Sequence, residues 1–138
     1  MALDVGSKRI GVAVSDPSAT FALPVATLER TNKKKDLEAI EALIASYQVD
    51  ELVVGDPLTL TGERGPAAAQ MDDFVETLRG VFSGTIHRMD ERLTTAQATK
   101  SLIAADISRR KRRAVVDRMA AALILDAFLA RRRRGGGA

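Results

Sequence analysis

The hydrophobic pattern of this chain changes its period near residue 30, and this change restricts the folds open to it. Before it, three short apolar runs with short links are predicted to be β-strands, at 3–5, 10–15 and 21–28. Three consecutive strands of this kind favour an antiparallel meander. Pro24 lies in the third run, and because proline cannot donate to a strand ladder, that strand is expected at an edge of the sheet.

After residue 30, helical and strand-like segments alternate. The expected elements are a helix at 35–47, a strand at 51–55, a helix at 66–82, a strand at 85–89, and helices at 94–107 and 114–132. A meander followed by alternation predicts an α/β fold with a five-stranded mixed sheet flanked by helices. We expect one domain over residues 1–132 and a flexible, basic and glycine-rich tail over 133–138.

Composition excludes several classes of protein. A chain of 138 residues suits one domain with a single core. It has no cysteine, which excludes a disulfide framework and a thiolate metal site or nucleophile. No apolar run reaches the length of a membrane span and no leader-like start is present, so the sequence predicts a soluble, intracellular protein without a membrane partner.

The positive charge is concentrated in short runs. The formal net charge is +3, and the cations cluster at Lys33–Lys35, Arg109–Arg113 and Arg131–Arg134. Such runs attract nucleic acid through phosphate contacts and counterion release. A solvated protein face is the alternative interpretation. The basic run 109–113 is expected to be a loop between the last two helices.

Three acidic positions stand out against the apolar pattern. Asp4 lies inside an apolar strand and precedes Gly6, so it either accepts hydrogen bonds from the turn or binds a ligand. Asp117 shares a helix face with Ala121 and Ile124 and is expected to point inward, as a dipole partner, in an ion pair with an arginine, or as a ligand.

The third acidic position is Glu91, which follows the fifth strand beside Asp90 and Arg92. Strand ends are where ligands collect in open sheets, although a local salt bridge or a helix cap would also explain these acids. If Asp4, Glu91 and Asp117 converge, they form an oxygen site of the kind that Mg²⁺ or Mn²⁺ prefers. Two such ions suit phosphodiester hydrolysis.

Four segments resemble the motifs of one family, in the same order. They are Leu3–Val14, Val53–Leu58 followed by Gly62, Asp90–Ala96, and Val116–Asp117 followed by Ala120–Leu125. The chain closely resembles the YqgF family, also called RuvX, which is Holliday-junction-resolvase-like and has a ribonuclease-H-like fold. The resemblance covers essentially the whole chain.

The resemblance implies an activity and a site. It implies a cytoplasmic metal-dependent nuclease that matures the 5′ end of precursor 16S ribosomal RNA, with some members linked instead to cutting four-way DNA junctions. The catalytic and metal-binding acids would then be Asp4, Glu91 and Asp117, with Mg²⁺ or Mn²⁺ as cofactor. The expected nucleic-acid contacts are Lys8, Arg9, Arg92, Arg109, Arg110, Lys111, Arg112 and Arg113.

The second motif departs from the family pattern at two places. Asp56 stands where leucine is usual, and Thr59–Thr61 stands where asparagine, methionine and aspartate are usual. An additional acid beside the site would alter metal affinity or repel substrate, so these departures bear on substrate preference.

Two other interpretations of the sequence remain open. The opening motif also resembles the phosphate loop of actin-like ATPases and sugar kinases, but those need two lobes and this chain supplies one. A nucleic-acid-binding regulator of transcription or ribosome assembly could keep the fold without cleavage. RNA trimming suits a monomer, whereas junction resolution needs a homodimer with paired sites. Because aromatic residues are only 4% of the chain, extensive base stacking is not expected.

Overall fold

The computed structural model describes residues 1–56, 65–90 and 109–135, with only the backbone for 109–114. This part of the chain forms, in order, β1 (Ala2–Val5), β2 (Arg9–Ser15), β3 (Ala22–Glu29), α1 (Lys33–Ser46), β4 (Glu51–Asp56), α2 (Pro66–Arg79), β5 (Thr85–Asp90) and α4 (Arg109–Arg133). Each agrees with an expected element to within a few residues, except at the start of the last helix. The expected helix at 94–107 lies outside the described residues.

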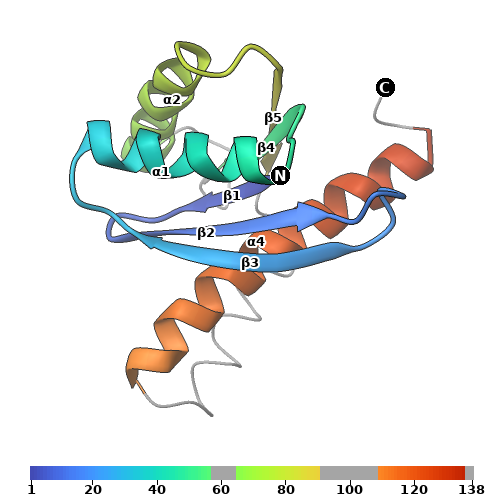
Figure 1. Cartoon of the computed structure of the whole chain (residues 1–138), viewed down its shortest axis with the longest axis horizontal. Coiled ribbons are helices and arrows are strands. Elements are labelled where there is room, and N and C mark those ends of the chain that lie inside the picture. Colours follow the sequence, from blue (N-terminus) through green and yellow to red (C-terminus); the bar gives the residue numbers. More distant parts are fainter. Residues whose placement is uncertain (57–64, 91–108, 136–138) are drawn as a thin grey trace.

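The five strands form one mixed sheet in the order β3-β2-β1-β4-β5 (Figure 1). β1 pairs antiparallel with β2 and parallel with β4, so the shortest strand lies at the centre. β2 and β3 complete the antiparallel meander, and β4 and β5 run parallel. These findings confirm the five-stranded mixed sheet, and Pro24 lies on edge strand β3, as proline requires.

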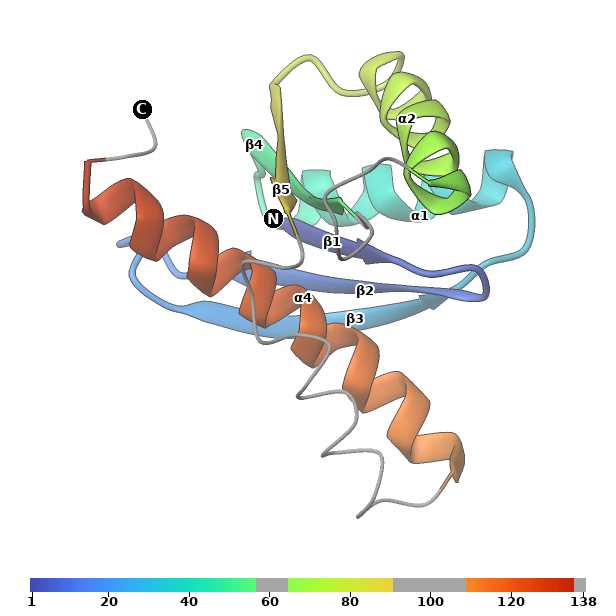
Figure 2. The same cartoon turned by 180° about the vertical axis from the view of Figure 1, so that it is seen from behind.

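Helices cover both faces of the sheet (Figures 1 and 2). α1 and α2 lie on one face, over a core that includes Leu3, Ile10 and Leu52. α4 crosses the other face over a second core rich in alanine, which includes Ala2 and Ala121. Because side chains alternate across a strand, neighbouring residues of β1 face different helices.

Local signals explain where the first two helices begin. The Asn32 side chain caps α1 by accepting a hydrogen bond of 2.9 Å from the backbone N–H of Lys35. Pro66 opens α2, where its missing N–H costs nothing and its fixed φ already suits a helix.

The basic run is where the sequence prediction was wrong. Arg109–Arg113 was expected to be a loop, but α4 already begins at Arg109 and runs for 25 residues. Arginine and lysine have long unbranched side chains and are good helix formers, so their charge does not prevent a helix. The first turns of α4 extend beyond the sheet (Figures 1 and 2). At its other end the helix includes Arg133, the first residue of the expected tail.

The carboxyl-terminal part of α4 is fixed to the sheet by a group that we call the Glu51 cluster: Glu51, His87, Phe128 and Arg132. Arg132 donates two hydrogen bonds of 3.0 and 2.9 Å to the Glu51 carboxylate, and His87 Nε2 lies 3.0 Å from Glu51 Oε1. Phe128 packs against both the His87 ring and the Arg132 guanidinium. His87 thus serves the contact between the sheet and the helix.

The helices also differ from membrane spans. Within the described ranges, none of them combines the length and the apolar character that crossing a bilayer would require.

Candidate active site

Asp4 is buried near the carboxyl end of the central strand. Its exposed fraction is 4%, among the lowest of the charged residues described. Two residues earlier, Ala2 packs in the core under α4, so Asp4 points to the same face of the sheet as that helix. Asp4 pairs with Gly11 on β2, and one step further along the register with β4 it is level with Gly55. Both strands beside Asp4 therefore have a glycine next to it, so neither β2 nor β4 places a side chain beside its carboxylate.

Gly11 brings the last helix to Asp4. A Cβ atom added to Gly11 would lie only 1.8 Å from the backbone carbonyl oxygen of Asp117, so the two main chains touch. Directly opposite residues of antiparallel strands have Cα atoms about 4.5–5.5 Å apart. Asp4 and Asp117 are therefore neighbours across a single glycine, although they lie near opposite ends of the sequence.

Asp117 points toward the sheet, as its helical periodicity predicted. Arg9 Nε donates a hydrogen bond of 3.0 Å to Asp117 Oδ2, and both side chains are about one-fifth exposed. The ion pair with an arginine, one of the three roles considered for this acid, is thus present. Asp126, by contrast, is exposed on the same helix and accepts a hydrogen bond of 3.1 Å from the backbone N–H of Ala22.

The turn Gly6–Arg9, here called the site turn, lies directly after β1. It is closed by a hydrogen bond of 2.8 Å from Gly6 N–H to the Arg9 carbonyl. Arg30 braces it twice, because its backbone N–H donates to the Lys8 carbonyl at 2.9 Å and its Nη1 donates to the Gly6 carbonyl at 2.8 Å. Lys8 itself is exposed, which leaves its ammonium group accessible to a phosphate.

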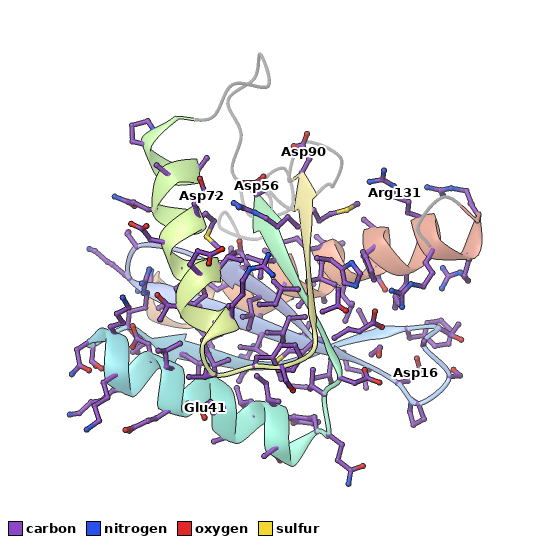
Figure 3. All side chains as sticks on the ribbon, turned by 90° about the horizontal axis from the view of Figure 1, so that it is seen from above. Asp16, Glu41, Asp56, Asp72, Asp90 and Arg131 are labelled. Atoms are coloured by element: carbon purple, nitrogen blue, oxygen red, sulfur yellow. The ribbon has the colours of Figure 1, made fainter. Side chains whose placement is uncertain are left out.

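The remaining expected site residues are only partly covered by the structure. Glu91 and Arg92 lie outside the described residues, but β5 ends at Asp90, immediately before them. β1, β4 and β5 are parallel, so their carboxyl ends reach the same edge of the sheet. Figure 3 shows Asp56 and Asp90 at the tips of β4 and β5. The side chains of Arg109–Arg113 are not described, and their backbone forms the start of α4.

The described residues supply two of the three carboxylates expected to hold a divalent metal ion, Asp4 and Asp117. In residues 1–56, 65–90 and 109–135, no three acidic, histidine or cysteine side chains gather closely enough to hold a metal ion. The third expected ligand, Glu91, is outside these ranges. Asp4 and Asp117 supply carboxylate oxygens, the donors that Mg²⁺ and Mn²⁺ prefer, and the chemistry of this donor set fits such a cation.

Comparison with known proteins agrees with this geometry. A family model described as "RuvX: Holliday junction resolvase" matches residues 1–131. The chain belongs to the RuvX family. Its relatives include proteins named "Putative pre-16S rRNA nuclease" in two bacteria. The protein of Desulforudis audaxviator is 44% identical over 98% of this chain and 96% of its own length. That of Thermoanaerobacter pseudethanolicus is 48% identical over 94% of both.

One feature of this RuvX-family chain was not predicted. Asp56, which stands where the family pattern has leucine, is 8% exposed and accepts a hydrogen bond of 2.9 Å from Arg88 Nη2. The other end of the Arg88 guanidinium bonds to Asp72 on α2 at 2.5 Å. Asp56 therefore belongs to an ion network between β4, β5 and α2, whose residues Asp56 and Asp72 are labelled in Figure 3. The register of β4 with β1 places Asp56 on the face of the sheet away from Asp4.

The sequence around Asp56 did not indicate its partners, since 32 positions separate it from Arg88. For the close approach of α4 to Gly11, the sequence contained a weak indication. A glycine inside a strand often marks a place where another backbone comes near, and the alanines at 120–122 show that α4 also presents small side chains.

Proposed function

We propose that this protein is a divalent-metal-dependent nuclease that hydrolyses phosphodiester bonds at the 5′ end of precursor 16S ribosomal RNA, in the cytoplasm. Membership of the RuvX family and the names of the relatives support this proposal. The structural observation that carries it is the placement of Asp4 beside Asp117 across Gly11.

In this proposal, Asp4, Glu91 and Asp117 hold Mg²⁺ or Mn²⁺. When bound, the cation lowers the pKa of a water molecule and stabilises charge on the leaving oxygen of an in-line displacement. The chain has to keep its carboxylates at a fixed spacing. The buried position of Asp4 and the main-chain contact between Gly11 and Asp117 supply that constraint on the described side of the site.

Cationic residues around the acids would hold the nucleic acid. Lys8 is exposed on the site turn and would contact a backbone phosphate. Arg9 is bonded to Asp117, so it would hold that carboxylate in place as well as add positive charge beside the phosphate. Arg92 and the basic run at the start of α4, residues 109–113, would extend the contact along the strand.

A second candidate function is the resolution of four-way DNA junctions, because the matching family model is described as a Holliday junction resolvase. That activity requires two sites on related strands and hence a homodimer. The same acids would serve both activities. The two functions are therefore distinguished by the substrate that is cut and by whether the protein is a monomer or a homodimer.

The deciding experiment presents the purified protein with precursor 16S RNA, an unrelated single-stranded RNA and a synthetic four-way DNA junction, with Mg²⁺, with Mn²⁺ and with chelator. We expect metal-dependent cleavage of the precursor RNA near its 5′ end. Asp4→Asn, Glu91→Gln and Asp117→Asn should each remove cleavage while the protein stays folded, as thermal unfolding would show.

Asp126→Asn is the matched control for Asp117→Asn, because it makes the same change on an exposed position of the same helix and should retain activity. Symmetric cutting of junctions without cleavage of RNA would replace the first function by the second. Binding without cleavage of any substrate would favour the regulator of transcription or ribosome assembly.

A further inference from the structure

A pocket formed by described residues lies on the α1 and α2 face of the sheet, with a volume of about 790 Å³. This is within the range of about 300–1,000 Å³ that is usual for ligand sites. Its wall includes Gly6 and Ser7 of the site turn, the start of α1, and one side of α2. The pocket therefore opens at the same end of the sheet as Asp4, on the opposite face.

The pocket has an apolar interior. Val5, Leu37, Met71 and Phe74 line it, and each is also packed in or against the core of this face. The Arg30 guanidinium lies over the Phe74 ring, with its central carbon 5.6 Å from the ring centroid. A stacked pair of this kind presents a flat surface, on which a planar ring can lie.

The polar groups of the lining do not form an anion site. Its two cations, Arg30 and Lys33, are matched by two carboxylates, Asp36 and Asp73. Arg30 is moreover held by Asp36, with Nε 3.5 Å from Oδ2. Such a balance disfavours a free phosphate or a polyphosphate.

The other polar groups suit a neutral ring with donors and acceptors at its edge. The lining includes Asn32, Gln70 and Thr77. Asn32 Oδ1 accepts a hydrogen bond from the Lys35 N–H and Thr77 Oγ1 donates one to the Asp73 carbonyl, whereas Gln70 is exposed. Asparagine and glutamine amides carry both donor and acceptor groups and pair with base edges. An apolar interior, a flat cationic surface and amide side chains in the lining suit the recognition of a nucleobase.

The site turn connects this pocket to the acids. Asp4 points to the α4 face, whereas Val5, the next residue, points into the pocket, and Gly6 and Ser7 continue its wall. A strand bound with one phosphate at Asp4 would therefore pass the site turn, where the neighbouring base could leave its stack and turn to the other side.

We propose that this pocket receives one unstacked nucleobase of the substrate strand, next to the phosphate that is cut. The proposal rests on the proposed nuclease function and adds a second recognition element to it. Enzymes that act on nucleic acid commonly read an extruded base in this way, by edge hydrogen bonds and stacking. A base held in the pocket would determine which phosphate of the nucleic-acid strand lies at the catalytic acids.

A first test probes the pocket without any polymer. The chain has four methionines, and they report separate places: Met71 lines the pocket, Met89 and Met1 are buried elsewhere, and Met119 is exposed on α4. With ¹³C-methyl-methionine protein, adenosine and cytidine 5′-monophosphates should shift the Met71 signal in a saturable way and leave Met119 in place. Inorganic phosphate should not shift Met71.

A second test uses two alanine positions of α2. Ala67 lines the pocket and is exposed, so Ala67→Trp should fill the pocket mouth without disturbing the core. Ala69 is also exposed, two residues on, and is not part of the lining, which makes Ala69→Trp the matched control. Binding is measured in chelator with RNA oligonucleotides in which one base at a time is removed.

In the wild type and in Ala69→Trp, one abasic position should weaken binding by about fivefold or more, the usual effect of losing one stacked base. In Ala67→Trp, binding of the intact strand should fall by a similar factor and the abasic position should have no further effect. Equal weakening at all positions in all three proteins would overturn the pocket proposal, as would nucleotide shifts absent from Met71.

The outcomes are distinct from those of the nuclease proposal. If the RNA is cut but no abasic position matters, the nuclease function stands and the pocket proposal is wrong. If nothing is cut in metal but the base effect and the Met71 shift are present, the pocket proposal stands as a binding site and the nuclease function is wrong.

Discussion

Arg9 and Asp117 are joined by a hydrogen bond of 3.0 Å between Nε and Oδ2, although 108 positions separate them in the chain. The bond links β2 to α4 beside the buried Asp4, and both partners are mostly shielded from solvent. A charged hydrogen bond in such surroundings is stronger than an exposed ion pair. It therefore has a measurable effect on stability as well as on the site.

The first prediction concerns this bond. Arg9→Gln and Asp117→Asn should each lower the free energy of unfolding, and a double-mutant cycle should give a coupling energy of about 1–2 kcal/mol. Chemical denaturation of the four proteins measures it. A coupling energy near zero would mean that the bond does not persist in solution. Arg79→Gln with Glu76→Gln, an exposed pair on α2, is the control and should show much weaker coupling.

The second prediction concerns the close approach at Gly11. Gly11→Ala places a Cβ about where the Asp117 carbonyl now lies, so α4 has to move away from β2. We expect stability to fall by about 1–3 kcal/mol and cleavage to fall strongly, because Asp117 moves with the helix. Gly80→Ala is the control, since the nearest atom to its added Cβ is 3.3 Å away. Wild-type cleavage by Gly11→Ala would contradict this account of the site.

The third prediction concerns Asp56. Its carboxylate is bonded to Arg88 on the face away from Asp4, so Asp56→Leu should leave the metal dependence of cleavage unchanged within about twofold. A metal titration of the cleavage rate measures this. A clear shift in the metal concentration needed would show that the additional acid acts on the site after all. Stability should fall, because Arg88 is left with one carboxylate partner in place of two.

The fourth prediction concerns the basic start of α4. Replacing the cations at 109–113 by glutamine should weaken RNA binding and make it less dependent on salt. For each phosphate that the protein no longer neutralises, the slope of log affinity against log salt should flatten by about 0.7. Arg131, Arg133 and Arg134 near the other end of the helix are exposed and supply the control set, compared per cation removed. If the control set flattens the slope as much as the first set does, the start of α4 has no special role.

The fifth prediction concerns acid stability. Hydrogen bonds from Arg132 and then from His87 lower the pKa of Glu51 to about 2, from an ordinary value of 4.5. A depressed carboxylate pKa contributes stability that is fully present above the unfolded value and disappears as the pH falls through the folded value. The stability difference between wild type and Glu51→Gln should therefore shrink as the pH falls from about 5 to about 2.

The control for acid stability is Glu41→Gln, which changes an exposed carboxylate on α1. Its difference from the wild type should stay small across the same range. Denaturation curves at several pH values measure both variants, and a constant difference for Glu51→Gln would contradict the prediction.

Much of the fold could be predicted because its signals are local. The alternation of apolar residues, Pro24 at an edge strand and Pro66 at a helix start all act within a few residues of their position. The inward direction of Asp117 followed from helical periodicity in the same way. The order of three strands and then alternating elements was enough to predict the mixed sheet.

The rest could not be predicted where local conformation depends on the neighbouring helix or where a partner is remote in sequence. Arg109–Arg113 was expected to be a loop between the last two helices, yet it forms the start of α4, as the helix propensity of arginine and lysine allows. The network of Asp56, Arg88 and Asp72 joins three elements, and no spacing within the sequence indicates it.

The way α4 is supported has a mechanical consequence. α4 contacts β2 where Gly11 meets Asp117, its residues 120–129 pack on the sheet, and Arg132 bonds to Glu51, so these contacts all lie on the carboxyl-terminal side of its first turns. In the proposed function, a strand bound at residues 109–113 would pull on turns that extend beyond the sheet, whereas Asp117 lies where the helix meets β2. The position of Asp117 would then change less than that of the turns that bind the strand.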